Sequence, residues 1–241
     1  MLVEFVSEIL KENSLVIVLI GILGSYLVTA QSLPFIVYFS KVKKLTAKVD
    51  ERSSHSSDIP NIGGIGIIAG IYIVTLSLSF FILNYDESKF IIALFISLLI
   101  LLFIGFKDDM VGLSAIAKLL TEIGTATAFI ILTDCRLDNF YGLFGIYEIN
   151  YFISITLSVF IFVVTINSYN LIDGIDGLAG GYGIISMIAF LFVSLLANNL
   201  IGVILCVTII GSLAGFLKFN LSKGKRKIFM GDTGSLVVGF L

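Results

Sequence analysis

The chain has 241 residues, of which 58% are hydrophobic and only 13% are charged, whereas a soluble domain carries about 25% charged residues. Its net charge of −2 does not favour nucleic acid as a partner. The two cysteines, Cys135 and Cys206, lie far apart in the sequence and indicate neither a disulfide framework nor a metal site. This composition excludes an ordinary soluble domain and predicts a polytopic protein of the lipid bilayer.

Seven apolar stretches are long enough to cross a bilayer, which takes about 20 mainly apolar residues. They cover residues 15–39, 61–83, 90–106, 115–133, 151–169, 181–197 and 200–219, and an eighth begins near residue 234. The apolar runs are continuous rather than alternating, which favours an all-α transmembrane helix bundle over a barrel. Pro34 is expected to kink or end the first helix. We treat residues 1–241 as a single integral-membrane domain.

Basic residues are concentrated in alternate loops. Twelve of the 15 lysines and arginines lie on one side of the predicted bundle. The positive-inside rule makes that side cytoplasmic and places the N-terminus outside. Residues 134–150 then form an extracytoplasmic hairpin.

Polar clusters gather on the predicted cytoplasmic side. They are Arg52 to His55 with the following IPNIGGIG, Asp108 and Asp109 with Lys118 and Glu122, the segment NSYNLIDGIDGLAGG, and Asn220 with IFMGDTGS. The outer loops carry no comparable cluster. We therefore expect the functional site at the cytoplasmic ends of the helices.

The segment from Asn167 to Gly181 has the most regular pattern. Its polar residues recur every third position, at Asn167, Asn170, Asp173 and Asp176. On a helix such residues share one face, so neighbouring members can point at one ligand. The alternative is a capped loop in which Asp and Asn are turn formers. Four such residues in register favour the ligand site.

Five carboxylates are expected to converge at this end of the bundle. They are Asp108, Asp109, Asp173, Asp176 and Asp232. Hard oxygen ligands select Mg²⁺ or Mn²⁺, and Mg²⁺ commonly bridges one or two carboxylates to substrate phosphates. The residues alone therefore predict a site for a divalent cation and a diphosphate, with a polyprenyl phosphate entering from the bilayer. An interfacial pair solvated by headgroups is the alternative for Asp108 and Asp109.

Several other residues have two interpretations each. Lys118 could pair with a phosphate or with Glu122 four residues later. Thr233 or Ser235 could bind an anion or simply cap the following helix. Phe229 could stack on a base or be buried apolar surface.

Four segments resemble the successive motifs of the polyprenyl-phosphate N-acetylhexosamine-1-phosphate transferases, glycosyltransferase family 4. They are HSSDIPNIGGIGI, GFKDDMVGLSAIAKLLTEI, NSYNLIDGIDGLAGG and KIFMGDTGSL, in the family's order. The first motif resembles the branch that uses simple UDP-N-acetylhexosamines. The resemblance implies a Mg²⁺-dependent enzyme of the bacterial cytoplasmic membrane, with Mn²⁺ as a substitute. It would transfer N-acetylhexosamine 1-phosphate from a UDP-sugar to undecaprenyl phosphate and release UMP, which initiates a cell-envelope polysaccharide.

The resemblance also implies roles for individual residues. The catalytic residues would be Asp108, Asp109 and Asp176. The metal ligands would be Asp232 and Asp173. The substrate-binding residues would be Arg52, His55, Lys118, Asn167, Asn170, Asp173, Asn220 and Phe229.

Three departures from the family pattern stand out. Glu122 replaces a common glutamine, and the run between Asn220 and Asp232 is longer and more basic. Family members also continue through further helices and a loop rich in histidine and arginine, so the resemblance implies a chain truncated at its C-terminus. A cation or proton transporter and an inactive fragment with a structural role remain alternatives. The oligomeric state is open, with a homodimer among the options.

Overall fold

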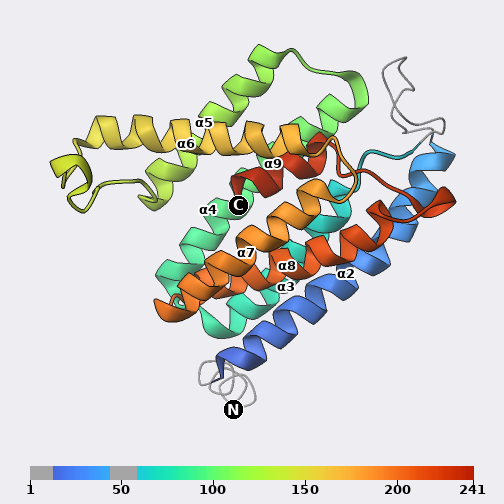
Figure 1. Ribbon diagram of the computed structural model, residues 1–241, viewed down its shortest axis with the longest axis horizontal. Coiled ribbons are helices and arrows are strands. Elements are labelled where there is room, and N and C mark those ends of the chain that lie inside the picture. The colour runs from blue at the N-terminus through green and yellow to red at the C-terminus, as the bar shows by residue number, and fades with distance from the viewer. Residues whose placement is uncertain (1–12, 44–58) are drawn as a thin grey trace.

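The computed structural model describes residues 13–43 and 59–241, and its regular structure there is helical (Figure 1). Seven helices are long and apolar enough to cross a membrane: α2 (Ser14–Val42), α3 (Gly64–Ile82), α4 (Tyr85–Val111), α5 (Ala115–Thr133), α6 (Tyr151–Ile172), α7 (Leu178–Leu196) and α8 (Leu200–Asn220). A shorter helix, α9 (Asp232–Phe240), follows. The predicted all-α membrane bundle is confirmed.

Two of the helices that extend beyond their predicted ends show how a local cap and tertiary packing set helix boundaries. α4 begins at Tyr85 because Asn84 and Glu87 form a reciprocal capping box at its N-terminus. α2 continues through Pro34 to Val42, so of the two alternatives expected there, a kink or an end of the helix, the end is not observed. Proline removes one backbone donor, but packing of the helix against its neighbours keeps the remaining turns in place.

The most enclosed of the seven long helices is α8, which packs against α2, α3 and α7. Figure 1 shows these four helices side by side, with α6 crossing above them. Small residues allow the close approach: a Cβ added at Gly215 would lie 2.9 Å from the Tyr26 carbonyl oxygen on α2. The short α9 packs against α3, α4 and α6 in the middle of the molecule. Its N-terminus is thereby fixed by three longer helices.

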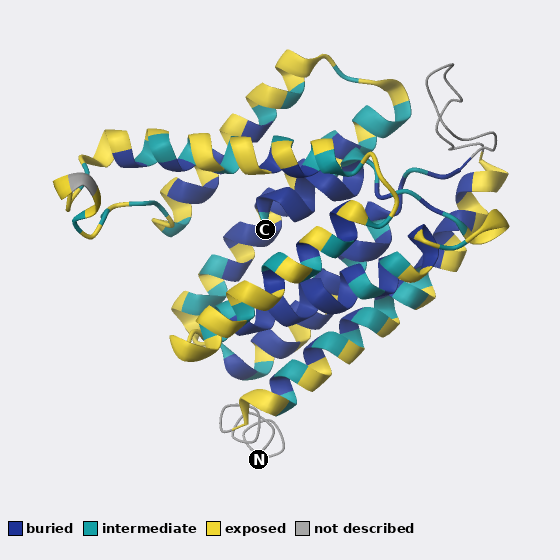
Figure 2. Cartoon of the chain, viewed as in Figure 1, coloured by how far each residue is buried: buried dark blue, intermediate teal, exposed yellow. Residues whose placement is uncertain are grey.

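Large apolar side chains cover the outside of the bundle. Phe35, Phe80 and Phe152 are 70%, 74% and 77% exposed, and Figure 2 shows exposed residues along the outer faces of the helices. Exposed apolar surface on this scale would aggregate in water but is stable in a hydrocarbon solvent. Burial therefore agrees with the membrane class that the composition predicts.

The helix ends sort the loops into two groups. α2, α4, α6 and α8 end where α3, α5, α7 and α9 begin, so the predicted polar clusters that the structure describes lie at one end of the bundle. The opposite end carries the segment 134–150, where Asn139 and Glu148 form an antiparallel bridge. The predicted hairpin is confirmed as a structure.

Candidate active site

The segment before α9 is held by backbone hydrogen bonds to the segment before α3. Phe229 N donates to Pro60 O at 2.8 Å, and Gly63 N and Gly64 N donate to Phe229 O and Met230 O, both at 2.9 Å. The chain then turns at Gly231, which has a φ of 70° and forms the N-cap of α9. These contacts fix the position of Asp232, the first residue of the helix.

The N-terminus of α9 is capped by a side chain from another helix, Asp109, which lies near the end of α4. Its Oδ2 accepts hydrogen bonds from Thr233 N at 2.9 Å and from the Thr233 hydroxyl. Its Oδ1 accepts from Asp232 N and from Asn61 Nδ2, both at 3.1 Å. A carboxylate at a helix N-terminus is favourable because it meets free N–H groups and the positive end of the dipole. Of the two interpretations of Thr233 and Ser235, the local helix cap is not observed, since α9 has no side-chain cap of its own.

Asp232 lies at the centre of the polar site. Its Oδ2 forms an ion pair with Lys118 of α5, and its Oδ1 accepts from Asn170 Nδ2 of α6 at 2.8 Å. Lys118 Nζ also lies 3.3 Å from Asp108 Oδ2. Lys118 therefore joins two of the predicted acids and does not pair with Glu122. Burial raises the pKa of Asp232, but hydrogen bonds with Asp108, Lys118 and Asn170 outweigh it and lower the pKa below its usual value.

Asp173, the C-cap residue of α6, has a different environment. The pKa of its carboxyl is raised to about 7. Burial is the largest cause, and the negative charge of Asp232 adds to it, while a hydrogen bond from the Gly231 backbone acts in the opposite direction. The ionised form of Asp173 is thus disfavoured until a cation compensates it. Asp173 and Asp232 together leave a place where positive charge is stabilised.

The four-residue row divides in the structure. The three-residue spacing predicted that all four residues share one helical face. α6 ends at Ile172, however, so Asp173 and Asp176 do not continue the face that carries Asn167 and Asn170. Asn170 reaches Asp232, and its amide also lies 2.7 Å from the Ser235 hydroxyl oxygen. Asp176 is turned outward and forms an ion pair with Lys227. The turn-forming glycines end the helix before the pattern does.

Asn167 lies one turn further into α6. Its Nδ2 donates to Glu122 Oε2 at 2.5 Å and to Val163 O at 2.9 Å. Glu122 is fully buried. The structure therefore places Asn167 against a membrane-helix carboxyl and not beside Asp232.

Asn220 and Phe229 hold the loops near the site. The buried Asn220 accepts from Gly177 N at 2.7 Å and donates to Ile228 O at 3.1 Å, which ties the α6–α7 turn to the segment before α9. The Phe229 ring lies 5.4 Å from Lys227 Nζ in a cation–π geometry. Arg52 and His55 lie outside the described residues.

Three contacts of the site were not predicted from the sequence. Asn61 supports Asp109, Glu122 holds Asn167, and Lys227 pairs with Asp176. Each partner is 45 or more residues away in the chain. No local spacing could have revealed these pairs, although Asn61, Glu122 and Lys227 all lie inside the motifs.

The carboxylates of the site fit a divalent cation only as a pair. Among residues 13–43 and 59–241, no group of three or more His, Cys, Asp and Glu side chains is close enough to form a cage. The five carboxylates expected at this end of the bundle therefore do not form a cage of three or more acids in the described part of the chain. Two acids nevertheless fit a Mg²⁺ ion that takes its other ligands from water and substrate phosphates. Asp173 and Asp232 are such a pair, because they are mutually repulsive and no cation from residues 13–43 or 59–241 forms an ion pair with Asp173.

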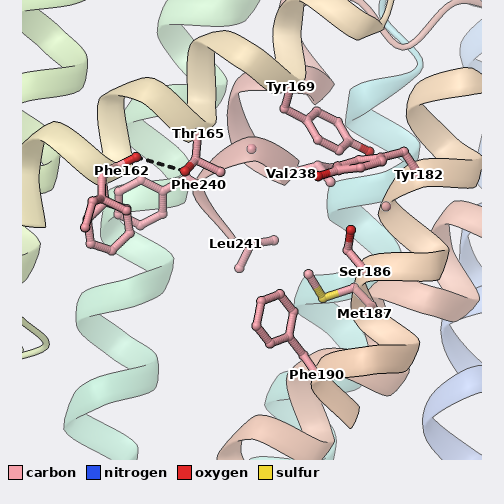
Figure 3. Close-up of a pocket in the computed structure, with 13 residues that line it drawn as sticks. Phe162, Thr165, Tyr169, Tyr182, Ser186, Met187, Phe190, Val238, Phe240 and Leu241 are labelled. Atoms are coloured by element: carbon pink, nitrogen blue, oxygen red, sulfur yellow. Dashed lines mark hydrogen bonds between the residues drawn. The ribbon is translucent and has the colours of Figure 1, made fainter. Parts of the chain in front are cut away.

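An apolar cavity of about 300 Å³ opens beside this cluster, between α6, α7 and α9. Figure 3 shows Tyr169 and Tyr182 at one end and Phe190 at the other, with Phe162 and Phe240 along one side. Tyr169 directly precedes Asn170, so the cavity adjoins the residues that hold Asp232. The site combines a polar helix-end cluster with an apolar recess.

Replacing Gly231 with alanine should displace Asp232. An added Cβ would collide with the Asn61 carbonyl oxygen and lie 2.7 Å from Asp109 Oδ2, and the φ of 70° disfavours any side chain. We expect the turnover of the site to fall by at least about tenfold, because a small misplacement of a reacting group has large effects. Initial rates and thermal unfolding of the purified protein provide the measurement.

Gly224→Ala is the matched control. Gly224 also has a positive φ, of 79°, but no atom lies within 4 Å of its added Cβ. The free energy of unfolding of that variant should fall by only roughly 1–2 kcal/mol, which is the cost of placing alanine in the left-handed region. Its activity should not change. Equal activity losses in the two variants would contradict the steric argument.

Comparison with known proteins places these residues in a family context. Residues 90–241 match the model of glycosyl transferase family 4. The chain is 32% identical to a phospho-N-acetylmuramoyl-pentapeptide-transferase of Staphylococcus carnosus, over 89% of the chain and 71% of the relative. It is 30% identical to the protein of that name from Enterococcus faecalis, over 93% of the chain and 73% of the relative.

A relative with a different described activity is equally similar. The chain is 31% identical to a probable undecaprenyl-phosphate N-acetylglucosaminyl 1-phosphate transferase of Bacillus subtilis, over 83% of the chain and 55% of that relative. Identity therefore does not separate the two branches. The matched segment includes the acids of α4, the α6–α7 turn and the N-terminus of α9. The chain belongs to glycosyl transferase family 4.

Proposed function

We propose that this protein transfers N-acetylhexosamine 1-phosphate from a UDP-sugar to a polyprenyl phosphate at the cytoplasmic face of the membrane. A lipid phosphate oxygen forms a new bond to the sugar-linked phosphorus, the bond between the two phosphates of the donor breaks, and UMP leaves. The relatives' names support the acceptor and the transferred group. The observation that carries the proposal is the Asp232 cluster, in which Lys118 and Asn170 hold one carboxylate at a helix N-terminus beside Asp173.

Phosphoryl transfer needs positioning and charge neutralisation more than covalent chemistry. We assign Asp232 and Asp173 to Mg²⁺, which would neutralise phosphate charge when bound. Lys118 meets a phosphate, and Asp108 positions the lipid phosphate next to it. Asp109 accepts two backbone N–H groups at the start of α9 together with the Thr233 hydroxyl, so we assign it the role of positioning α9.

The nucleotide is assigned to the loop side of the cluster. Phe229 offers a ring beside Lys227, and Asp176 lies across the same loop. Asn220 shapes this surface by tying the two loops together. Asn170 holds Asp232, and Asn167 supports α6 from inside through Glu122.

The apolar cavity suits the isoprenoid chain of the acceptor. Its lining is mainly aliphatic and aromatic, and it adjoins the polar cluster through Tyr169. A lipid whose phosphate reaches Asp108 and Lys118 could place its first isoprene units there. This arrangement favours a lipid acceptor over a water-soluble one.

The function is tested by incubating purified protein with undecaprenyl phosphate, Mg²⁺ and a panel of UDP-N-acetylhexosamines. UMP and lipid-linked sugar are quantified, with EDTA added to a parallel reaction. Metal-dependent product from one donor would support the proposal and name the sugar. Absence of product, both from this chain and from one extended to the length of its relatives, would contradict it.

Narrowing the cavity should affect lipid use selectively. Ser186 lines the cavity from α7, and Ser186→Phe would fill part of its volume. We expect KM for a long-chain polyprenyl phosphate to rise about tenfold, the scale of losing about 1.4 kcal/mol of binding. KM for a short-chain analogue should change little.

Ala189→Phe is the control on the same helix, because Ala189 is exposed and lies outside the cavity lining. It should leave both KM values near those of the wild type. A Ser186→Phe protein whose KM is unchanged for every chain length would remove the cavity from the proposed lipid path.

A further inference from the structure

A second cavity, of about 650 Å³, lies away from the Asp232 cluster, between the last turns of α2 and the end of α8. Its apolar wall includes Ala30, Pro34 and Val37 of α2. Its basic side chains are Lys41, Lys218, Lys225 and Arg226. Among the residues that the structure describes, no acidic side chain belongs to this lining, so the four positive charges meet no carboxylate from that part of the chain.

The basic residues are brought together by the fold and not by adjacency in the sequence. Lys41 ends α2, and its ammonium donates to Lys225 O at 2.5 Å, across 184 residues of sequence. Lys218 lies in the last turn of α8, with its Nζ 6.0 Å from the Phe219 ring. Arg226 follows in the short 3-10 turn after α8. Like charges held this close favour an anionic ligand.

The surroundings of the cavity suit a lipid better than a free ion. Tyr38 lines it and is 67% exposed, which is typical of a tyrosine at the membrane–water boundary. Below it on α2, Phe35 and Leu27 are 70% and 52% exposed and form an apolar path for acyl chains. Basic pockets between transmembrane helices commonly hold anionic lipid headgroups.

We propose that this α2–α8 cavity binds the phosphodiester headgroup of an anionic phospholipid. The headgroup phosphate pairs with Lys41, Lys218 and Arg226, while the acyl chains follow the exposed face of α2. The lipid is a structural ligand and not the acceptor of the transferase reaction.

Occupancy would stabilise the loop that leads to the active site. Phe219 lines the cavity and is followed by Asn220, whose side chain holds Gly177 and Ile228. A headgroup bound to Lys218 and Arg226 would join the start of this loop to α2. The effect on the site is therefore indirect, through the segment that positions Asp232.

The test measures lipid retention directly, by native mass spectrometry of the purified protein with phosphatidylglycerol, phosphatidylcholine or inorganic phosphate. The wild type should retain phosphatidylglycerol in preference to phosphatidylcholine. Lys218→Gln combined with Arg226→Gln should weaken phosphatidylglycerol binding by about 30-fold, the scale of removing two cations near an anionic headgroup.

Lys43→Gln combined with Lys223→Gln is the matched control. Both lysines are exposed in the same two segments but do not line the cavity, and the change in net charge is identical. A second variant, Ala30→Phe, keeps all four cations while filling the cavity, and it should also reduce retention. Thermal unfolding without added lipid verifies that each variant is folded.

Three results would overturn the proposal. Equal losses in the two double variants would mean diffuse interfacial charge and not a site. Equal retention of both lipids by the wild type would remove the preference for an anion. Thermal stabilisation by inorganic phosphate alone, with no lipid retained, would assign the cavity to a free phosphate. These readouts are independent of transferase activity, so they stand apart from the test of the proposed function.

Discussion

Replacing Asp232 with asparagine should lower turnover by about 100-fold or more at any Mg²⁺ concentration. The substitution keeps the shape of the side chain but removes the charge that pairs with Lys118 and that we assign to the metal. Loss of one preorganised electrostatic group at a reacting centre typically lowers the rate by about 10²–10³-fold. The measurement is the rate of UMP release over a Mg²⁺ titration.

Asp86→Asn is the control for the loss of one carboxylate. Asp86 is paired with Lys89 on the surface at the opposite end of α4, and its side chain is 86% exposed. That variant should retain wild-type turnover. A near-normal rate in the Asp232→Asn protein would remove Asp232 from the metal site and would leave the cluster with a structural role.

Replacing Asp109 with alanine should lower both stability and activity. Four donors, from Asn61, Asp232 and Thr233, would lose their carboxylate acceptor at the N-terminus of α9. Hydrogen bonds to charged groups contribute about 1.5–3 kcal/mol each, and partial replacement by water leaves an expected loss of about 3 kcal/mol. We expect Tm to fall by about 6–12 °C, together with most of the activity.

Asp108→Ala separates this structural role from a catalytic one. Asp108 accepts from Leu113 N and from Lys118, and it meets α9 only through the Asp232 side chain and not through the N–H groups at the start of the helix in the described hydrogen-bond network. It should lose activity with a smaller shift in Tm. If Asp109→Ala instead keeps the wild-type Tm while losing activity, Asp109 acts on the substrate and the catalytic role expected from the family resemblance is restored.

The sequence predicted the membrane class and nearly every helix because both depend on local composition. A continuous apolar run must form a helix in hydrocarbon, where each backbone group needs an internal partner. The seven predicted spans accordingly match seven helices, and the eighth begins at Asp232, close to residue 234. The boundary of α4 moved because the Asn84 and Glu87 caps outweigh hydropathy at its start.

The motifs also identified most of the polar cluster. Asp108, Lys118, Asn170 and Asp232 do meet, as their shared position at helix ends had implied. Asp176 departed from its row because α6 ends first. Residues spaced three apart share a face only while the backbone is helical. The helix stops after Ile172, where the glycines favour a turn.

The sequence by itself determined that the chain is a bundle of membrane helices with the acids of its polar clusters at one end, because hydropathy and loop charge are properties of short segments. Only the tertiary structure decided which acid does what. Asp109 and Asp232 differ because one meets the free N–H groups of α9 and the other meets the Lys118 ammonium. The pairing of Lys41 with the Lys225 carbonyl likewise depends on how α2 packs against α8. Such contacts join residues far apart in the chain, and their energies depend on burial and geometry that no local pattern records.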